Sequence, residues 1–234
     1  MLTTRRSDQL YLIGVREQAA TEGHARVTFL TTRGDLEADA RAVHGAKQAV
    51  VLLGGSAHEH CFDSDLDLLP RDLAEHGIGS LRIDYRSPGD CAQCAIDALL
   101  ACQYLDDEGV SDVLLVGWSF GASVAIAAGS VARIVRGVAA VSPIDVPDCC
   151  VRRMCRKPLL VITGEGNDLA SADCVRRVLL DSESHARLLT YPGQRHGLWG
   201  VRERVRADLL DWIALSFDAS QASRASAAMG RATA

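Results

Sequence analysis

Short apolar runs alternate with amphipathic, helix-like segments along most of the chain. The runs predicted to be strands are 27–32, 36–43, 48–53, 81–84, 113–116, 138–141, 159–163 and 187–191. The segments predicted to be helices are 64–76, 97–107, 122–128, 172–180 and 202–217. This alternation is typical of βαβ units. We therefore expect an α/β fold whose mainly parallel central sheet is covered by helices on both faces.

The first two apolar runs are expected to form a hairpin. Arg33, Gly34 and Asp35 lie between them and make a turn-forming sequence. These strands would form an antiparallel N-terminal edge on the sheet. At the other end, residues 218–234 are mostly Ala, Ser, Arg and Thr with little apolar periodicity. We expect a mobile tail there, with an alanine-rich helical extension as the alternative.

Length and composition fit one globular domain. The chain has 234 residues, 48% hydrophobic and 24% charged, and its net charge of -5 is spread along the sequence. Nothing in this charge pattern calls for nucleic acid. The apolar run 10–15 contains Gly14 and is too short for a signal-peptide core or a membrane span. We expect a cytoplasmic protein with neither a nucleic-acid nor a membrane partner.

The cysteines raise the question of a metal or redox site. Cys91 and Cys94 form one C-x-x-C pair, and Cys149, Cys150 and Cys155 lie close together, but a second pair at zinc-finger spacing is missing from the sequence. We interpret the eight cysteines as reduced side chains packed as small hydrophobic groups. A thiol-redox or metal-binding protein is the least favoured alternative.

His58, His60 and Cys61 form a second group of candidate metal ligands. The spacing of a helical H-E-x-x-H zinc motif is absent, and the sequence offers no further ligand nearby. We expect these residues to lie in a loop near the mouth of a pocket, and we predict no metal site.

Residues 117–121 read Gly-Trp-Ser-Phe-Gly and fit the pattern G-x-S-x-G. A predicted strand precedes them and a helix rich in small residues follows. A serine on such a sharp turn needs glycine two residues before and two residues after it to avoid steric collision. This context makes Ser119 the candidate nucleophile, and a serine of this kind requires a base.

His196 is the candidate base. It lies in a loop directly after the last predicted strand and before the last helix, where a histidine can reach the end of a central strand. The surroundings of the remaining histidines outside the 58–60 segment give no reason to expect catalysis, and these are His24, His44, His76 and His185.

Asp168 is the preferred acid to orient that base. The strand 159–163 runs into a loop that contains Asp168, at the edge of the sheet where ligands gather in α/β folds. The chain order is then Ser, Asp, His. Asp145, in the loop after the preceding strand, is the main competitor, and Glu165 is a weaker one.

An oxyanion hole is expected beside the nucleophile. The backbone N–H of Phe120 directly follows Ser119, and the strand 48–53 ends in a glycine-rich loop. The second donor we predict is the backbone N–H of Ser56 or Ala57.

Together these motifs resemble the α/β-hydrolase superfamily, most closely its small esterase-like or dienelactone-hydrolase-like members. The resemblance covers residues 25–217, leaving 1–24 as an N-terminal extension, and rests on the Gly54-Gly55 loop, the Asp-Tyr-Arg turn at 84–86, the 117–121 motif, the Asp168 loop and His196-Gly197. It implies a mostly parallel sheet of about eight strands, the catalytic residues given above and no cofactor. Only the short stretch 143–158 stands where many relatives insert a cap, so we expect an open pocket.

The predicted function is hydrolysis of a small-molecule ester or thioester through an acyl-enzyme. An acyltransferase with the same catalytic residues is equally compatible with the sequence. A different class of function is a non-catalytic small-ligand-binding protein on the same fold, and its sequence sign would be a missing catalytic residue.

Overall fold

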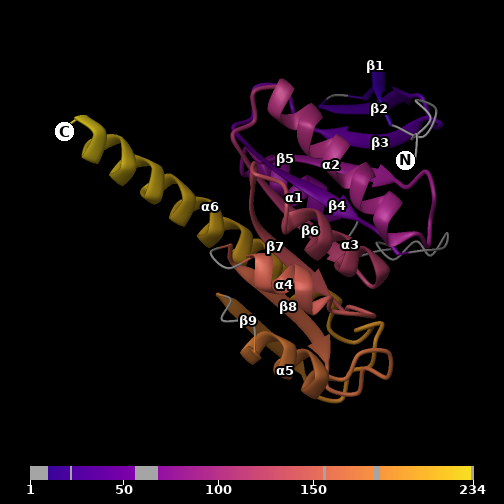
Figure 1. The fold of residues 1–234 in the computed structure, drawn as a ribbon, viewed down its shortest axis with the longest axis vertical. Coiled ribbons are helices and arrows are strands. Elements are labelled where there is room, and N and C mark those ends of the chain that lie inside the picture. The colour runs from indigo at the N-terminus through magenta and orange to yellow at the C-terminus, as the bar shows by residue number, and fades with distance from the viewer. Residues whose placement is uncertain (1–9, 22, 56–67, 155–156, 182–184, 233–234) are drawn as a thin grey trace, which may run out of the picture.

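The structure, a computed structural model, describes residues 10–21, 23–55, 68–154, 157–181 and 185–232. These residues form a nine-stranded sheet in the order β1-β2-β3-β5-β4-β6-β7-β8-β9 (Figure 1). The strands are β1 (Leu12–Thr21), β2 (His24–Thr31), β3 (Leu36–Arg41), β4 (Gln48–Leu53), β5 (Gly79–Asp84), β6 (Asp112–Trp118), β7 (Val135–Val141), β8 (Leu159–Gly164) and β9 (Ala186–Tyr191). From β5 across to β9 all neighbours pair in parallel, which confirms the predicted fold class.

The antiparallel N-terminal edge is also confirmed, and it is one strand wider than the sequence indicated. β1 pairs antiparallel with β2, β2 with β3, and β3 with β5. Part of the segment 1–24, expected to precede the domain, therefore supplies an edge strand. The side chains of Ile13 and Val15 in β1 are exposed. Leu12 packs against the core, so β1 is held by this contact and by its backbone pairing with β2 rather than by a continuous buried apolar face.

The described residues form six helices, of which the first five connect strands and the last follows β9. They are α1 (Leu69–Glu75), α2 (Cys91–Asp107), α3 (Phe120–Gly129), α4 (Asp148–Met154), α5 (Ala172–Asp181) and α6 (Arg202–Ala232). The first residues of the predicted helix 64–76, up to 67, lie outside the described part of the chain. α4 was not expected. It buries Val151 and Met154. α6 continues to Ala232 and projects beyond the sheet (Figure 1), so the helical alternative for 218–232 holds.

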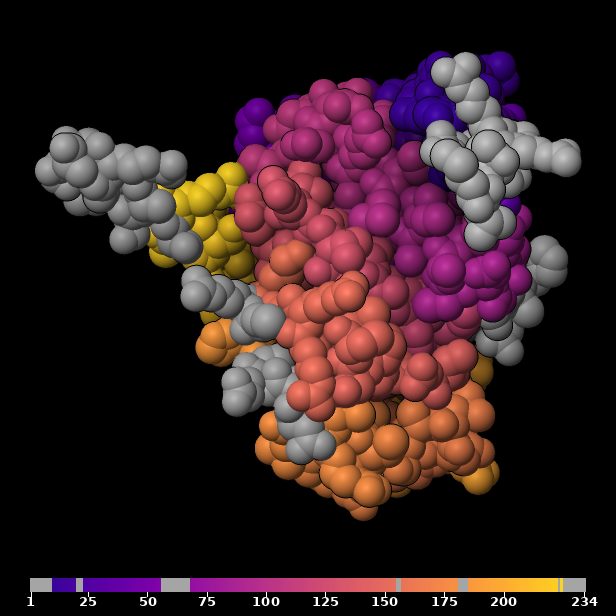
Figure 2. Space-filling view, viewed as in Figure 1, coloured from indigo at the N-terminus to yellow at the C-terminus, as the bar shows by residue number. Residues whose placement is uncertain are grey.

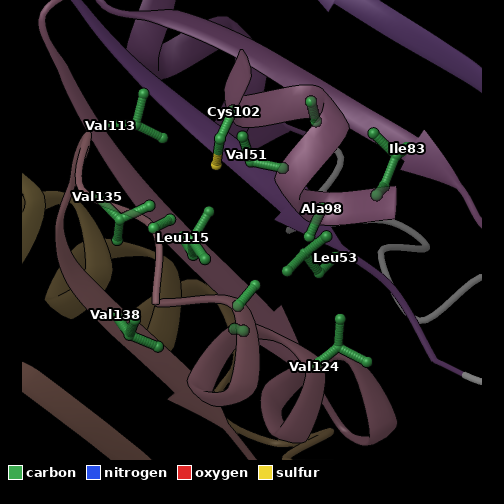
Figure 3. Packing of buried hydrophobic residues seen from close by; sticks show 14 of the residues in the cluster. Val51, Leu53, Ile83, Ala98, Cys102, Val113, Leu115, Val124, Val135 and Val138 are labelled. Carbon is green, nitrogen blue, oxygen red and sulfur yellow. The ribbon is translucent and has the colours of Figure 1, made fainter. Parts of the chain in front are cut away.

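Two apolar layers lie on opposite faces of the sheet. Because neighbouring side chains of a strand point to opposite faces, Val51 and Leu53 of β4 pack under α2 and α3, whereas Val50 and Leu52 pack under α1 and α6. Figure 3 shows the first layer, in which Val51 and Leu53 face the helical side chains of Ala98, Cys102 and Val124. Burial on both faces explains why the central strands are apolar at almost every position.

The order of the strands creates a switch point between β4 and β6. The chain moves from β4 to β5 on one side and then returns to β6 on the other. Loops leaving such neighbours diverge, which is where α/β proteins place their ligands.

Figure 2 shows the face covered by α2, α3 and α4. Among the described residues, no helix is both long and apolar enough to span a membrane.

Candidate active site

Ser119 lies on a sharp turn between β6 and α3, as its motif predicts. Its φ of 55° is in a region that side chains other than glycine rarely adopt. A Cβ atom on Gly117 would lie 2.1 Å from the carbonyl oxygen of Gly121, and one on Gly121 would lie 2.2 Å from that of Leu53. Both glycines are therefore required by close backbone approach, and the physical reason predicted for them is confirmed.

His196 reaches Ser119 from the loop after β9. The Oγ atom of Ser119 and the Nε2 atom of His196 are 2.9 Å apart. This loop is seated on the loop after β8, where the N–H of Gly166 donates to the carbonyl oxygen of Gln194 at 2.9 Å. A Cβ on Gly164 would lie 2.3 Å from the same oxygen. The lack of a side chain at Gly164 thus lets the two loops touch and brings the imidazole over the serine.

The Nδ1 atom of His196 contacts Asn167 rather than Asp168. Its distance to the Oδ1 atom of Asn167 is 3.2 Å. Asn167 is only 3% exposed, whereas the side chain of the next residue, Asp168, faces solvent. Asp145 is exposed as well, and its backbone carbonyl accepts a hydrogen bond from the Oγ atom of Ser123 at 2.7 Å. The structure thus places an amide at the position that the sequence reasoning gave to the carboxylate of Asp168.

The side chain of Asn167 is hydrogen-bonded at both ends. Its Nδ2 donates to the Oγ1 atom of Thr163 at 3.0 Å and to the carbonyl oxygen of Pro143 at 3.5 Å. Its Oδ1 accepts from the backbone N–H of Leu169 at 3.1 Å. These contacts fix a buried amide beside the Nδ1 atom of His196.

One predicted oxyanion donor is described. Phe120 is the first residue of α3, so its N–H has no helical carbonyl to bind and lies at the positive end of the helix. Ser56 and Ala57, the other predicted donors, lie outside the described residues. The loop that leads to them packs directly on the turn, because a Cβ on Gly121 would lie 2.4 Å from the carbonyl oxygen of Gly54.

The turn after β5 contacts both the loop after β4 and the start of α3. The hydroxyl of Tyr85 donates to the carbonyl oxygen of Gly54 at 3.3 Å, and its ring meets that of Phe120 edge to face. Burial raises the pKa of the Tyr85 phenol, so the proton stays available for donation. Arg86 donates from its side chain and from its backbone to the fully buried carboxylate of Asp97. This ion pair fixes the turn.

The cysteines show no sign of ligand chemistry in the part of the chain that is described. No three His, Cys, Asp or Glu side chains in these ranges are grouped closely enough to hold a metal ion. Burial raises the pKa of Cys91, and it raises the pKa of Cys94 to about 12, so both thiols are protonated near neutral pH. The sulfur atoms of Cys149 and Cys150 are 3.9 Å apart. Four residues of the predicted clusters lie outside the described residues: His58, His60, Cys61 and Cys155.

Sequence reasoning missed two residues of this region. Asn167 is one position away from the residue chosen for its carboxylate, and Tyr85 was noted only as part of a turn. Ser119 and His196 are brought together. The available signal was the cluster of polar residues after β8, but a sequence cannot tell which of two adjacent side chains turns inward.

Comparisons with known proteins agree with this architecture. No curated protein is similar enough in sequence to count as a match. Among solved structures, the chain is similar to Est1E from Butyrivibrio proteoclasticus, with a TM-score of 0.67, 15% identity and coverage of 79% of this chain and 95% of that one. It is also similar to a dienelactone hydrolase from Anabaena variabilis, with a TM-score of 0.68, 19% identity and coverage of 86% and 97%. The third is the esterase Pf2001 from Pyrococcus furiosus, with a TM-score of 0.69, 17% identity and coverage of 82% of this chain and 89% of that one.

At these identities the solved structures establish the fold alone. The family comparison goes further, because the model of the alpha/beta hydrolase family matches residues 43–233, which is most of the chain. This range includes the turn at Ser119, the loop of Asn167 and the loop of His196. The chain therefore belongs to the alpha/beta hydrolase family.

Proposed function

We propose that the chain is a serine hydrolase that cleaves a small-molecule ester or thioester through an acyl-enzyme on Ser119. The observation that carries this proposal is the 2.9 Å contact between the Oγ atom of Ser119 and the Nε2 atom of His196. A serine hydroxyl is a weak nucleophile near neutral pH, and a neutral imidazole that accepts its proton makes it reactive. The strained backbone of Ser119 supports the same role, because such strain is common at active sites.

Acylation begins when Nε2 of His196 takes the proton of Ser119 as the serine oxygen attacks the substrate carbonyl carbon. The carbonyl oxygen becomes an oxyanion, and the N–H of Phe120 donates to it, together with the N–H of Ser56 or Ala57 from the loop after β4. Collapse of this intermediate breaks the ester or thioester bond. The protonated His196 then gives its proton to the departing alcohol or thiol.

Deacylation uses the same groups in reverse. His196 takes a proton from water as the water oxygen attacks the acyl-serine, and it returns the proton to Ser119 when the acid leaves. The ester-bond class is supported by the proteins of similar fold, of which one is an esterase and another a dienelactone hydrolase. An acyltransferase would follow the same path with another acceptor in place of water, so added alcohols or thiols would be acylated.

The test is hydrolysis of p-nitrophenyl esters from acetate to octanoate, followed by thioesters. We expect turnover by the wild type and its loss in Ser119→Ala and His196→Ala. Ser123→Ala is the matched control, because this serine of α3 is as buried as Ser119 but its hydroxyl donates to the carbonyl of Asp145. Activity that survives in Ser119→Ala, or a wild type inert on every ester and thioester, would contradict the proposal.

A second candidate function is a non-catalytic small-ligand-binding protein, and one observation favours it. The residue at Nδ1 of His196 is Asn167, an amide where a serine hydrolase ordinarily has a carboxylate. A fluorophosphonate probe separates the candidates, since it labels an activated serine without needing the correct substrate. Mass spectrometry of the wild type and Ser119→Ala gives the answer: labelling of the wild type alone supports the hydrolase, and an unlabelled, folded wild type supports the binding protein.

A further inference from the structure

We propose that Asn167 is a positioning residue that holds His196 with its proton on Nδ1, leaving Nε2 free to accept the proton of Ser119. The inference deepens the proposed function and rests on it. It assigns to an uncharged side chain the orienting task that a carboxylate performs in most triads. Three contacts of the amide carry the argument.

The neighbours of Asn167 determine which way its amide faces. The backbone N–H of Leu169 can only donate, so the atom it meets must be the carbonyl oxygen, Oδ1. The carbonyl oxygen of Pro143 can only accept, so the atom facing it must be the amino group, Nδ2. Thr163 accepts from the same amino group. Rotating the amide by half a turn would set donor against donor at one end and acceptor against acceptor at the other.

The orientation of this amide decides the tautomer of the imidazole. Because Oδ1 of Asn167 is an acceptor, the Nδ1 atom of His196 at 3.2 Å must be the donor. The Nε2 atom of the neutral ring is then unprotonated and can accept from Ser119. An asparagine with its amino group toward Nδ1 would select the opposite tautomer, an arrangement that costs a triad about 10⁴-fold in kcat. The contacts with Pro143 and Leu169 exclude that arrangement here.

An amide supplies direction but no charge. A carboxylate at the same position would place a negative charge beside Nδ1 and so stabilise the protonated imidazolium of His196. Asn167→Asp is therefore an informative variant, because its inner oxygen can still accept from Nδ1 and its outer oxygen can accept from the hydroxyl of Thr163, although the 3.5 Å donation to the carbonyl of Pro143 is lost. The charged groups on the neighbouring loops and on α6 stay constant in this comparison, and they are Asp145, Glu165, Asp168, Arg195 and Arg202.

The first test measures the rate of fluorophosphonate labelling against pH. We expect Asn167→Ala to label about 10- to 100-fold more slowly, because the ring loses its orienting acceptor. Asn167→Asp should recover the rate to within about 10-fold of wild type at pH 8, with its acidic limb moved upward by about one pH unit or more. Asp168→Asn, the adjacent control, should stay within about 2-fold of wild type because its side chain faces solvent.

The outcomes that would contradict the role of Asn167 differ from the outcome that would contradict the proposed function. Loss of labelling in Asp168→Asn but not in Asn167→Ala would overturn the role of Asn167 and leave the proposed function intact. An acidic limb that does not move in Asn167→Asp would assign Asn167 a merely structural role. A wild type that is not labelled would instead contradict the proposed function.

The second test does not depend on activity. The ¹⁵N chemical shifts of the imidazole of His196, identified by the signals lost in His196→Gln, report which nitrogen carries the proton. We expect protonated Nδ1 in the wild type at pH 8 and a mixture of tautomers in Asn167→Ala. Protonated Nε2 in the wild type would overturn the inference even if the enzyme proved active.

Discussion

The two ends of the parallel sheet each contain a buried polar side chain, but the two residues are satisfied in different ways. At the amino end, the carboxylate of Asp112 is 1% exposed and accepts from the Nε atom of Arg136 at 2.6 Å and from Ser220 at 2.8 Å, with Arg224 also paired to it. At the carboxyl end, Asn167 is 3% exposed, and its described side-chain hydrogen bonds are with uncharged groups of neighbouring residues and with His196.

The comparison indicates that the two ends of the sheet have different roles, with stabilising ion pairs at one end and the candidate active site at the other. The charge of Asp112 is neutralised by guanidinium groups, and the contact with Ser220 and Arg224 ties α6 to the start of β6. The carboxyl end is instead strained and closely packed. Three of the four described non-glycine residues with positive φ lie there: Ser119, Ser142 and Leu198. We therefore expect substitutions at the carboxyl end to change activity, with a loss of stability as well where they disturb close backbone packing, and substitutions at the amino end to change stability alone.

The largest effect expected is on activity in Ser119→Ala. The rate of ester hydrolysis should fall by at least about 10³-fold, because the nucleophile is removed. The free energy of unfolding should change by less than about 1 kcal/mol, since a small, partly paired hydroxyl is lost. Kinetics combined with urea unfolding check both parts. A large loss of stability in this variant would break the proposed separation.

The next effect compares two glycines at opposite ends of the sheet. Gly121→Ala places a methyl group 2.2 Å from the carbonyl oxygen of Leu53, so we expect a loss of about 3 kcal/mol or more together with most of the activity. Gly45→Ala, in the loop between β3 and β4, has positive φ but nothing within 4 Å, and should cost about 1 kcal/mol and leave activity unchanged. Equal costs in thermal unfolding would argue against strain from close packing.

A smaller effect is expected on removing the buried charge at the amino end. Asp112→Ala leaves Arg136 and Arg224 without their carboxylate, and because both arginines are partly exposed we expect a loss of about 1–3 kcal/mol. Activity per folded molecule should be unchanged. Arg71→Ala, which breaks an exposed pair with Glu75, is the control and should cost less than about 0.5 kcal/mol. A drop in kcat for Asp112→Ala would show that the two ends are coupled.

The smallest effect expected is the pH dependence of stability that comes from His44 at the amino end. The carboxylate of Glu17, and with it that of Glu108, raises the pKa of His44 above 6.5. The charged histidine therefore contributes stability that is fully present below pH 6.5 and is lost as pH rises through the raised folded-state pKa. His44→Ala should destabilise the protein at pH 6 by less than about 1 kcal/mol, because the side chain is largely exposed, and by less still at pH 9. A larger cost at pH 9 would contradict this assignment.

The local pattern of apolar residues and glycines was sufficient to predict the central strands and the turn at Ser119. β4 spans the predicted residues 48–53, because a strand buried on both faces is apolar at nearly every position and ends at glycine. The requirement for Gly117 and Gly121 likewise follows from the short range of the steric contacts in a strand-to-helix turn. β1 was missed because Ile13 and Val15 are exposed, and α4 because a seven-residue helix is too short to show a clear periodicity; pairing or packing with distant segments stabilises both.

The sequence by itself determined the fold class, the sheet edge that carries the candidate site, and the contact of Ser119 with His196, since each depends on residues adjacent in the chain or on the order of the strands. Only the tertiary structure decided that Asn167 rather than Asp168 meets the imidazole. The contact between the loops after β8 and β9, made possible by Gly164, fixes the path of the backbone at that point. That path turns Asn167 inward toward Thr163 and Pro143 and leaves the side chain of Asp168 in water. The exposed carboxylate keeps its hydration shell and so avoids the free-energy cost of burying a charge.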